Sequence, residues 1–236
     1  MSEPAPRYDI TTAVSVIIPV RNRPRLLPDA VASAQAQDHE VEIVIVDDGS
    51  TDDTPAVAEA LAAADERVVV LHVAHGGPGA ARNAGLRAAR HPLAANLDSD
   101  DAMTPDRLAH QVGLLVAHPG TVGTLGAVEQ DVTSDAAPAH LVRAWGGQGQ
   151  VERGALSTLL VDRAIALAVG GYDEDHLISE DLDLYRRLRR AGHEVRLDDR
   201  VVGRRRLHEG NLSHLNEDPG AALLAFLRRG LPDRPR

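Results

Sequence analysis

Three aspartates, Asp98, Asp100 and Asp101, lie within four residues and directly follow a short apolar run. In an extended segment, side chains two positions apart point to the same side, so this spacing predicts that Asp98 and Asp100 share a face. Two carboxylates on one face repel each other unless a cation lies between them, and hard oxygen ligands suit Mg²⁺ or Mn²⁺. Such an ion keeps coordination positions for phosphate oxygens. A polar turn ahead of a helix explains the same residues, so the rest of the chain must decide.

Strand and helix patterns alternate through the first half of the chain. Apolar, β-branched runs predict strands, and 3.6-residue periodicity predicts helices. The strands are expected at residues 14–18, 41–46, 68–73 and 93–97, and the helices at 24–37, 54–64, 80–90 and 104–117. Thr54-Pro55 and Thr104-Pro105 each indicate an N-cap followed by proline at the first helical position. This order predicts an α/β fold with a mostly parallel central sheet and helices on both faces.

Ligands of such sheets bind outside the carboxyl ends of the strands. The predicted ends are polar or glycine-rich, and they fall at residues 19–22, 47–50, 75–77 and 98–101. The aspartate cluster therefore lies where a ligand is expected.

The second half is less regular. Residues 121–133 predict strands, 155–168 a strand followed by a helix, and 179–190 a helix that Gly192 ends. Residues 194–197 and 201–202 predict two short strands, and 221–229 a short amphipathic helix. We expect a flexible tail over residues 1–12, one domain over 13–215 with halves 13–117 and 118–215, and a C-terminal tail over 216–236.

Composition excludes several classes of function. The formal net charge of -10 argues against a nucleic acid or an anionic membrane as the main partner. All 25 basic residues are arginine, so chemistry that needs a lysine is excluded. Cysteine is absent, which excludes disulfides, thiolate nucleophiles and cysteine metal sites. The sequence shows no signal-peptide pattern and no apolar run long enough to cross a bilayer, so we expect a cytoplasmic protein without an integral membrane segment.

Two further segments could bind a nucleotide. Asp47 and Asp48 end the second predicted strand, where a carboxylate can accept a hydrogen bond from a base or a ribose hydroxyl. An Asx turn before the helix at Pro55 explains part of this segment. Gly77-Pro78-Gly79 suggests a dinucleotide fingerprint, but Arg82 occupies the third glycine position and the segment follows the third strand rather than the first.

Seven motifs together resemble glycosyltransferase family 2, the inverting enzymes with the GT-A fold. They cover roughly residues 14 to 213 and occur in the family's order. The motifs are Val16-Ile17-Ile18-Pro19-Val20-Arg21-Asn22, Ile45-Val46-Asp47-Asp48-Gly49-Ser50-Thr51-Asp52, Ala81-Arg82-Asn83-Ala84-Gly85, Leu97-Asp98-Ser99-Asp100-Asp101, Gly170-Gly171-Tyr172-Asp173-Glu174, Glu180-Asp181-Leu182-Asp183-Leu184 and His208-Glu209-Gly210-Asn211-Leu212-Ser213.

The resemblance implies a nucleotide-diphosphate sugar donor, most commonly a UDP-sugar in this family, with GDP and dTDP left open. The implied nucleotide-binding residues are Pro19, Val20, Asn22, Asp47, Asp48, Arg82, Asp98 and Ser99. Asp100, with Asp98 and His208, would bind the Mn²⁺ or Mg²⁺ that bridges the diphosphate. Arg204, Arg205 and Arg206 could instead make this region a phosphate clamp.

The resemblance also implies that Asp181 is the general base, with Glu180 orienting the acceptor or the site. This pair lies at the start of a predicted helix with Ser179 as its cap, where the helix dipole favours an ionised carboxylate. Simple helix capping explains the same residues. Two departures put the shape of the pocket in doubt: Arg21 stands where the family often has an aromatic residue, and Asn96 where it has an apolar one. Trp145 could stack on a sugar or simply pack.

The acceptor is not named by the sequence and could be a small molecule, a peptide, a lipid-linked sugar or a glycan. Because the transmembrane helices of polysaccharide synthases are missing from the acceptor region, we expect a soluble acceptor. Two other functions remain open. One is a catalytically silent nucleotide-sugar binding protein, which transfer activity would exclude. The other is a sugar-phosphate nucleotidyltransferase, but the expected glycine-rich loop with arginine and lysine does not follow the first strand.

Overall fold

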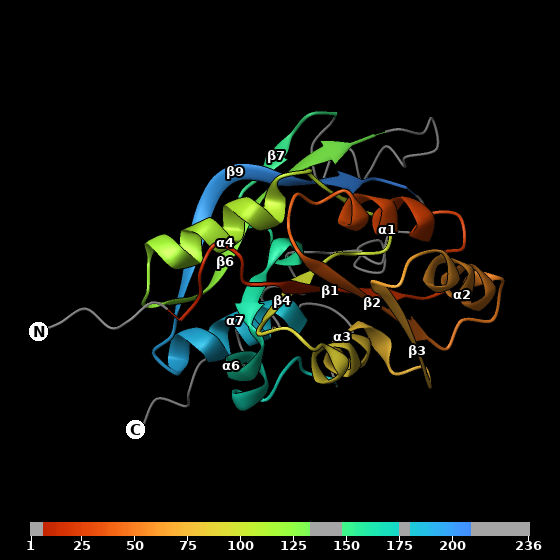
Figure 1. The fold of residues 1–236 in the computed structure, drawn as a ribbon, viewed down its shortest axis with the longest axis horizontal. Coiled ribbons are helices and arrows are strands. Elements are labelled where there is room, and N and C mark those ends of the chain that lie inside the picture. Colours follow the sequence, from red (N-terminus) through yellow and green to blue (C-terminus); the bar gives the residue numbers. More distant parts are fainter. Residues whose placement is uncertain (1–6, 133–147, 175–179, 209–236) are drawn as a thin grey trace, which may run out of the picture.

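A computed structural model describes residues 7–132, 148–174 and 180–208, and its central feature is one mixed β-sheet (Figure 1). The strand order is β3-β2-β1-β4-β8-β6-β9-β5, with β7 paired to β6. The strands β3, β2, β1 and β4 run parallel, and β6 and β9 are also parallel to each other. The sheet is therefore mostly parallel, as predicted, with antiparallel pairs at β8, β7 and β5.

The first half follows the predicted alternation. Its elements are β1 (Val14–Val20), α1 (Leu27–Gln35), β2 (Val41–Asp48), α2 (Thr54–Ala64), β3 (Val68–Val73), α3 (Gly77–Ala88) and β4 (Leu93–Asn96). Every residue of β2 and β4 is buried, because helices cover both faces of this part of the sheet. Their continuous apolar runs are typical of such doubly covered parallel strands.

The second half contains shorter elements around two long strands. They are β5 (Ala102–Met103), α4 (Arg107–Ala117), β6 (Thr121–Asp131), β7 (Val151–Glu152), a 3₁₀ helix η1 (Leu156–Thr158), β8 (Leu160–Asp162), α6 (Arg163–Ala168), α7 (Glu180–Arg190) and β9 (Glu194–Arg206). Strand β6 has a glycine at position 126, where β9 passes very close. A Cβ at this position would lie 2.4 Å from a methyl carbon of Val202. Glycine is therefore the residue that lets these two strands pair at this point.

Two apolar clusters fill the two faces of the sheet. Val16 and Ile18 of β1 pack with α1, α2 and α4, whereas Ile17 packs with α3, α6 and α7. This is the alternation of side chains along a strand, with both sides buried. Figure 1 shows the same division, with α3, α6 and α7 below the sheet in that view. The two helix layers hold the strand ends in place, and those ends carry the site.

Several predicted boundaries were wrong. Thr54 is the first residue of α2 rather than its cap, and α4 starts at Arg107 with Asp106 before it. Thr104 instead joins the sheet, because its N–H donates to the Val202 carbonyl at 3.1 Å. Helix α3 begins at Gly77, three residues earlier than expected.

In the second half, residues 194–206 form one strand where two were predicted. Residues 194–197 and 201–206 both pair with β6, and the register shifts between them, so the charged residues 198–200 bulge within one continuous strand. The single strand β6 accounts for most of residues 121–133. Ser179, Trp145 and the helix predicted over 221–229 lie outside the described residues. Within the described parts of the chain, no helix is long and apolar enough to cross a membrane.

Candidate active site

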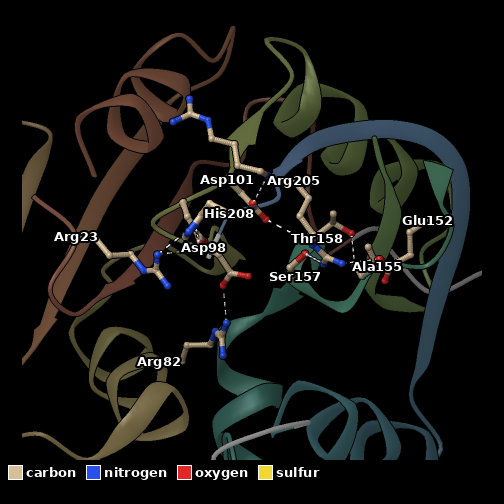
Figure 2. Close-up of polar contacts among 12 residues, drawn as sticks. Arg23, Arg82, Asp98, Asp101, Glu152, Ala155, Ser157, Thr158, Arg205 and His208 are labelled. Carbon is tan, nitrogen blue, oxygen red and sulfur yellow. Dashed lines mark hydrogen bonds and ion pairs between the residues drawn. The ribbon is translucent and has the colours of Figure 1, made fainter. Parts of the chain in front are cut away.

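The predicted functional residues gather around the carboxyl ends of β1, β2 and β4, the end of β9 and the start of α7. Figure 2 shows Arg23, Asp98, Asp101 and His208 near one another, with Arg82 reaching Asp98 from α3 and Arg205 extending from Asp101 toward Ser157. In the sequence, Arg82 and Glu180 are 98 residues apart, yet their side chains form an ion pair. The site is therefore assembled by the fold and joins its two halves.

The segment that carries Asp98 and Asp100 is a turn, not the extended segment that we expected. Strand β4 ends at Asn96, and the Asp101 N–H donates to the Asp98 carbonyl at 3.0 Å. The alternation of strand side chains no longer applies, and the two carboxylates have different partners: Asp98 pairs with Arg82, and Asp100 with His208 and Arg23. The prediction that Asp98 and Asp100 share one face of an extended segment, where they could bind a single cation together, was therefore wrong.

Asp100 has two positively polarised neighbours. Its Oδ2 lies 3.1 Å from His208 Nε2 and 3.4 Å from Arg23 Nη1. Burial of Asp100 raises the pKa of its carboxyl, but His208 and Arg23 act more strongly together and leave that pKa below its usual value. Asp100 is therefore held as a carboxylate.

Asp101 faces inward from the same turn. It is 7% exposed, and its Oδ1 accepts from the Arg206 N–H at 3.1 Å. Burial and the charges of Asp100 and Asp98 raise the pKa of Asp101 well above its usual value, although Arg205 opposes them. The Arg205 side chain extends from Asp101 to Ser157 and Glu152 (Figure 2). Arg205 thus connects the acidic turn to the second half of the sheet.

Arg82 connects the two acidic regions. One guanidinium nitrogen donates to Asp98 Oδ1 at 2.6 Å, the other donates to Glu180, and the group lies 5.7 Å from the centre of the Tyr172 ring. Burial disfavours its charge, but Glu180 and Asp98 together raise the pKa of Arg82 above its ordinary value. The arginine is 5% exposed, so these ion pairs are shielded from water.

Glu180 and Asp181 begin α7. For both residues burial is the largest effect and raises the pKa of the carboxyl, while Arg82 opposes it. We expected the helix dipole to favour the ionised form, and here burial outweighs it. Asp181 Oδ1 accepts from the Leu182 N–H at 2.7 Å. Within the described residues Glu180 has a salt bridge with Arg82, whereas Asp181 has none.

A buried hydrogen-bond network supports Arg82 from below. The Asn83 side chain bonds both backbone groups of Tyr172: its Oδ1 accepts from the Tyr172 N–H at 2.7 Å, and its Nδ2 donates to the Tyr172 carbonyl at 2.8 Å. The Tyr172 hydroxyl in turn donates to Asn96 Oδ1 at 2.8 Å. The polar residue Asn96, which departs from the family pattern, therefore pairs with a tyrosine. The sequence motifs contained Asn83 and Tyr172, but no spacing showed that they meet.

The predicted nucleoside side is a set of loops fastened to each other. Asn22 has a positive φ of 54°, its Oδ1 accepts from the Thr51 N–H at 2.9 Å, and its N–H donates to the Ser50 hydroxyl at 3.0 Å. Asp47 bonds His72 at 3.0 Å. The bonds of Asn22 join the loops after β1 and β2, and Asp47 and His72 are neighbours on the paired strands β2 and β3.

Asp48, another predicted nucleotide-binding residue, bonds the backbone here. Asp48 accepts from the N–H groups of Gly76 and Gly77 at 2.7 and 3.0 Å, at the start of α3, and from His75. Val20 and Ser99 are 2% and 5% exposed, respectively. Pro19 is partly buried. Asp48 therefore fixes the helix that carries Arg82.

The donor atoms for a metal ion fit only in part. Within residues 7–132, 148–174 and 180–208, no group of three or more histidine, aspartate or glutamate side chains is arranged to hold a metal. Asp100 Oδ2 and His208 Nε2 are 3.1 Å apart, close to the roughly 3.0 Å between neighbouring ligands of an octahedral ion with bonds of about 2.1 Å. These two atoms fit a divalent ion that takes its other ligands from phosphate and water. Asp98, turned to Arg82, does not join them here.

Residues 15–162 match the family described as glycosyl transferase family 2. Similar curated proteins include the succinoglycan biosynthesis proteins ExoU and ExoO of Rhizobium meliloti (strain 1021). ExoU is 35% identical over 152 residues, which cover 64% of this chain and 41% of ExoU. ExoO is 41% identical over 108 residues, which cover 45% of this chain and 31% of ExoO. The matches thus span less than half the length of these relatives.

Solved structures share the fold at low sequence identity. The mannosyltransferase PcManGT from Pyrobaculum calidifontis, in complex with GDP-Man and Mn²⁺, has a TM-score of 0.69 at 19% identity and covers 98% of this chain and 69% of that one. S. aureus TarS 1–349, in complex with UDP-GlcNAc, has a TM-score of 0.66 at 21% identity and covers 84% of this chain and 60% of that one. These likenesses confirm the predicted GT-A fold.

Proposed function

Since the chain belongs to glycosyl transferase family 2, we propose that it moves a sugar from a nucleotide-diphosphate donor to a hydroxyl of an acceptor, with inversion at the anomeric carbon. One observation carries this proposal. Arg82 links Asp98, in the acidic turn, to Glu180, beside Asp181. A donor held at the turn and a base at α7 would therefore face a common space.

The proposed donor site is the turn after β4 with the fastened loops of β1 and β2. Asp100 and His208 would contact the metal ion, and the Asn22 and Asp47 loops would border the nucleoside. A bound Mn²⁺ or Mg²⁺ would neutralise the negative charge that develops on the leaving diphosphate, so no general acid is required. Arg82 keeps Asp98 in place beside this site.

The proposed base is Asp181. Its buried position raises the pKa of its carboxyl, which brings a proton acceptor closer to the pKa that is most effective near neutral pH. Glu180 is paired with Arg82 and would position the acceptor side. The acceptor hydroxyl would lose its proton to Asp181 as its oxygen attacks the anomeric carbon from the side opposite the diphosphate.

The donor base and the sugar are narrower proposals. The TarS structure holds UDP-GlcNAc and the PcManGT structure holds GDP-Man with Mn²⁺, so both bases occur on this fold. We favour a UDP-sugar with Mn²⁺ or Mg²⁺, because UDP is the commonest donor base in the family. The acceptor would be a small molecule, a peptide or a glycan.

A transfer assay tests the proposal. The protein is incubated with UDP-, GDP- and dTDP-sugars, Mn²⁺ and a panel of acceptors, and the released nucleoside diphosphate is measured. We expect release with one donor base, loss of release in Asp181→Asn, and a product whose anomeric configuration by NMR is opposite to that of the donor. Nucleotide binding without release under any condition would favour the silent binding protein.

A further inference from the structure

From the sequence, we assigned no role to Arg23. In the structure its guanidinium contacts Asp100 and His208, the two proposed metal ligands. Its Nη1 is 3.4 Å from Asp100 Oδ2 and 3.2 Å from His208 Nε2. Figure 2 shows the side chain reaching from the loop after β1 toward His208. The three side chains are 16%, 12% and 21% exposed, in that order, so the contact is largely shielded from water.

The backbone of Arg23 is fixed on both sides. Its N–H donates to the Thr54 hydroxyl at 2.8 Å, and its carbonyl accepts from the N–H groups of Leu26 and Leu27 at 3.3 and 3.2 Å. The preceding Asn22 has a positive φ and is bonded to the loop after β2. These bonds fix the backbone position from which the Arg23 side chain extends toward Asp100.

The contact has the chemistry of a cation site. In one tautomer His208 Nε2 donates to Asp100, and in the other it carries no proton and accepts from Arg23. Asp100 Oδ2, 3.1 Å away, presents a second lone pair to the same group. In the second tautomer both atoms are acceptors, and the guanidinium beside them offsets their repulsion. A divalent ion would use the same two lone pairs, so ion and guanidinium compete for them.

We propose that Arg23 is a resident cation that holds Asp100 and His208 together until donor and metal bind, and that its guanidinium then pairs with the diphosphate of the donor. The planar guanidinium matches phosphate geometry with two parallel hydrogen bonds, which suits this second position. The inference rests on the proposed function, because it needs a diphosphate ligand. It makes Arg23 a positioning residue for the metal ligands and a binding residue for the donor.

The test compares Arg23→Gln with Arg25→Gln, a matched control two residues away whose side chain is exposed. Binding of Mn²⁺ alone is measured by electron paramagnetic resonance of the free ion, and binding of UDP with Mn²⁺ by calorimetry. We expect Arg23→Gln to bind Mn²⁺ alone about fivefold more tightly, because a like charge has left the site. We expect the same variant to bind UDP with Mn²⁺ about tenfold more weakly, because a charged hydrogen bond to phosphate is lost.

Two further variants strengthen the comparison. Asp100→Asn should abolish the tight Mn²⁺ binding in both backgrounds, which shows that the measured ion lies at this site. Arg23→Lys keeps the charge without the planar group, so it should bind Mn²⁺ as the wild type does and UDP with Mn²⁺ more weakly.

The outcomes separate this inference from the proposed function. Equal Mn²⁺ affinity of Arg23→Gln and wild type, including no binding by either, would overturn the competition. Unchanged UDP affinity in Arg23→Gln would overturn the contact with diphosphate. Wild-type protein that binds none of UDP, GDP, dTDP and CDP with Mn²⁺ would instead refute the proposed function itself.

Discussion

The two acidic regions of the site, the turn at residues 98–101 and the start of α7, differ in how their charges are compensated. Around the turn, Arg82 meets Asp98, Arg23 and His208 meet Asp100, and Arg205 lies near Asp101. At the start of α7, Arg82 reaches Glu180, and among the described residues Asp181 has no salt bridge. The same residue type therefore stands in two electrostatic settings.

This difference shows how one site can hold two kinds of carboxylate. In the turn, His208 and Arg23 keep the pKa of Asp100 low, so it stays ionised and can hold a cation, whereas burial raises the pKa of Asp101 beside it. At the start of α7, burial outweighs the charge of Arg82 and raises the pKa of Asp181, so this carboxylate can take up a proton during a reaction. Arg107, the first residue of α4, is a further charged group close to Asp98 and Asp101. It is 2% exposed, and burial lowers its pKa to about 10 while Asp98 and Asp101 oppose that effect.

The largest expected effect comes from changing Asp181, the carboxylate at the start of α7 that has no salt bridge among the described residues. Asp181→Asn keeps the shape but cannot accept a proton, so we expect kcat to fall about 1,000-fold, or about 4 kcal/mol of barrier. Binding of UDP with Mn²⁺ should change by less than about twofold, because the proposed donor contacts lie at the turn. Calorimetry and donor turnover measure the two quantities. A variant with normal turnover would remove Asp181 from the chemistry.

The same residue predicts a pH profile. Burial raises the pKa of Asp181, and the base must be ionised to act. Turnover under kcat conditions should therefore fall as pH decreases through that raised pKa, at a pH above the ordinary value of 3.8. A rate profile from pH 4 to 8 checks this, with circular dichroism to confirm that the fold persists. A flat profile over this range would contradict the assignment of Asp181 as base.

The next effect removes the link between the two regions. Arg82→Gln leaves the buried Glu180 and the partly exposed Asp98 without their counter-charge, so the free energy of unfolding should fall by about 3 kcal/mol, mostly through Glu180. Arg87→Gln is the matched control on the same helix: Arg87 is 61% exposed and lies 3.9 Å from Glu174, so its loss should cost less than about 0.5 kcal/mol. Urea unfolding measures both.

A second change sharpens the Arg82 result. Adding Glu180→Gln to Arg82→Gln removes one unpaired buried charge, so part of the lost stability should return. Equal stability of the single and double variants would mean that the Arg82–Glu180 pair carries little net energy.

A smaller effect concerns the support below Arg82. Asn83→Ala leaves the backbone N–H and carbonyl of Tyr172 without the partners they have here, so the free energy of unfolding should fall by about 2 kcal/mol. The ring of Tyr172 and the Arg82 above it would lose their fixed position, and kcat should fall with stability. Chemical unfolding and turnover measure the two effects. A change in neither would show that the network is dispensable.

The smallest effect lies at the nucleoside end. His72 bonds Asp47 and Glu59, and these bonds raise the pKa of His72 above its usual 6.5. The resulting stability is present below pH 6.5 and is lost as pH rises through the raised pKa. His72 is 45% exposed, so His72→Gln should cost less than about 1 kcal/mol. Melting temperatures of the two proteins should differ at pH 6 and converge at alkaline pH.

The sequence predicted the first half of the fold well, because its strands are continuous β-branched runs between helical patterns. Strand β9 was divided in two, since its charged stretch at residues 198–200 lacks the apolar pattern of a covered strand. The start of α4 was misplaced because Thr104 serves β9 instead of the helix. A local sequence pattern predicts whether a segment is a helix or a strand. It predicts less well which other segment a backbone N–H or carbonyl will bond.

Motifs indicated a candidate site, but not the contacts within it. The aspartates, the Glu180-Asp181 pair and His208 were assigned from residue type and resemblance, and these roles stay predictions. The turn at 98–101 was missed, because alternation assumes that the strand continues. The contacts of Arg82 with Glu180, Asn83 with Tyr172 and Arg23 with Asp100 join segments far apart in the chain, and only the folded arrangement shows them.

A melting-temperature series with UDP, GDP, dTDP and CDP, each with Mn²⁺ or with a chelator, tests the central claim that the turn at residues 98–101 holds a nucleotide diphosphate. A ligand at about 100 times its dissociation constant adds about 2.7 kcal/mol of stability. In a chain of this length that is a rise of about 5 °C or more. We predict this rise for one base, only with Mn²⁺, and its loss in Asp100→Asn. No rise with any nucleotide, with or without metal, would contradict the account.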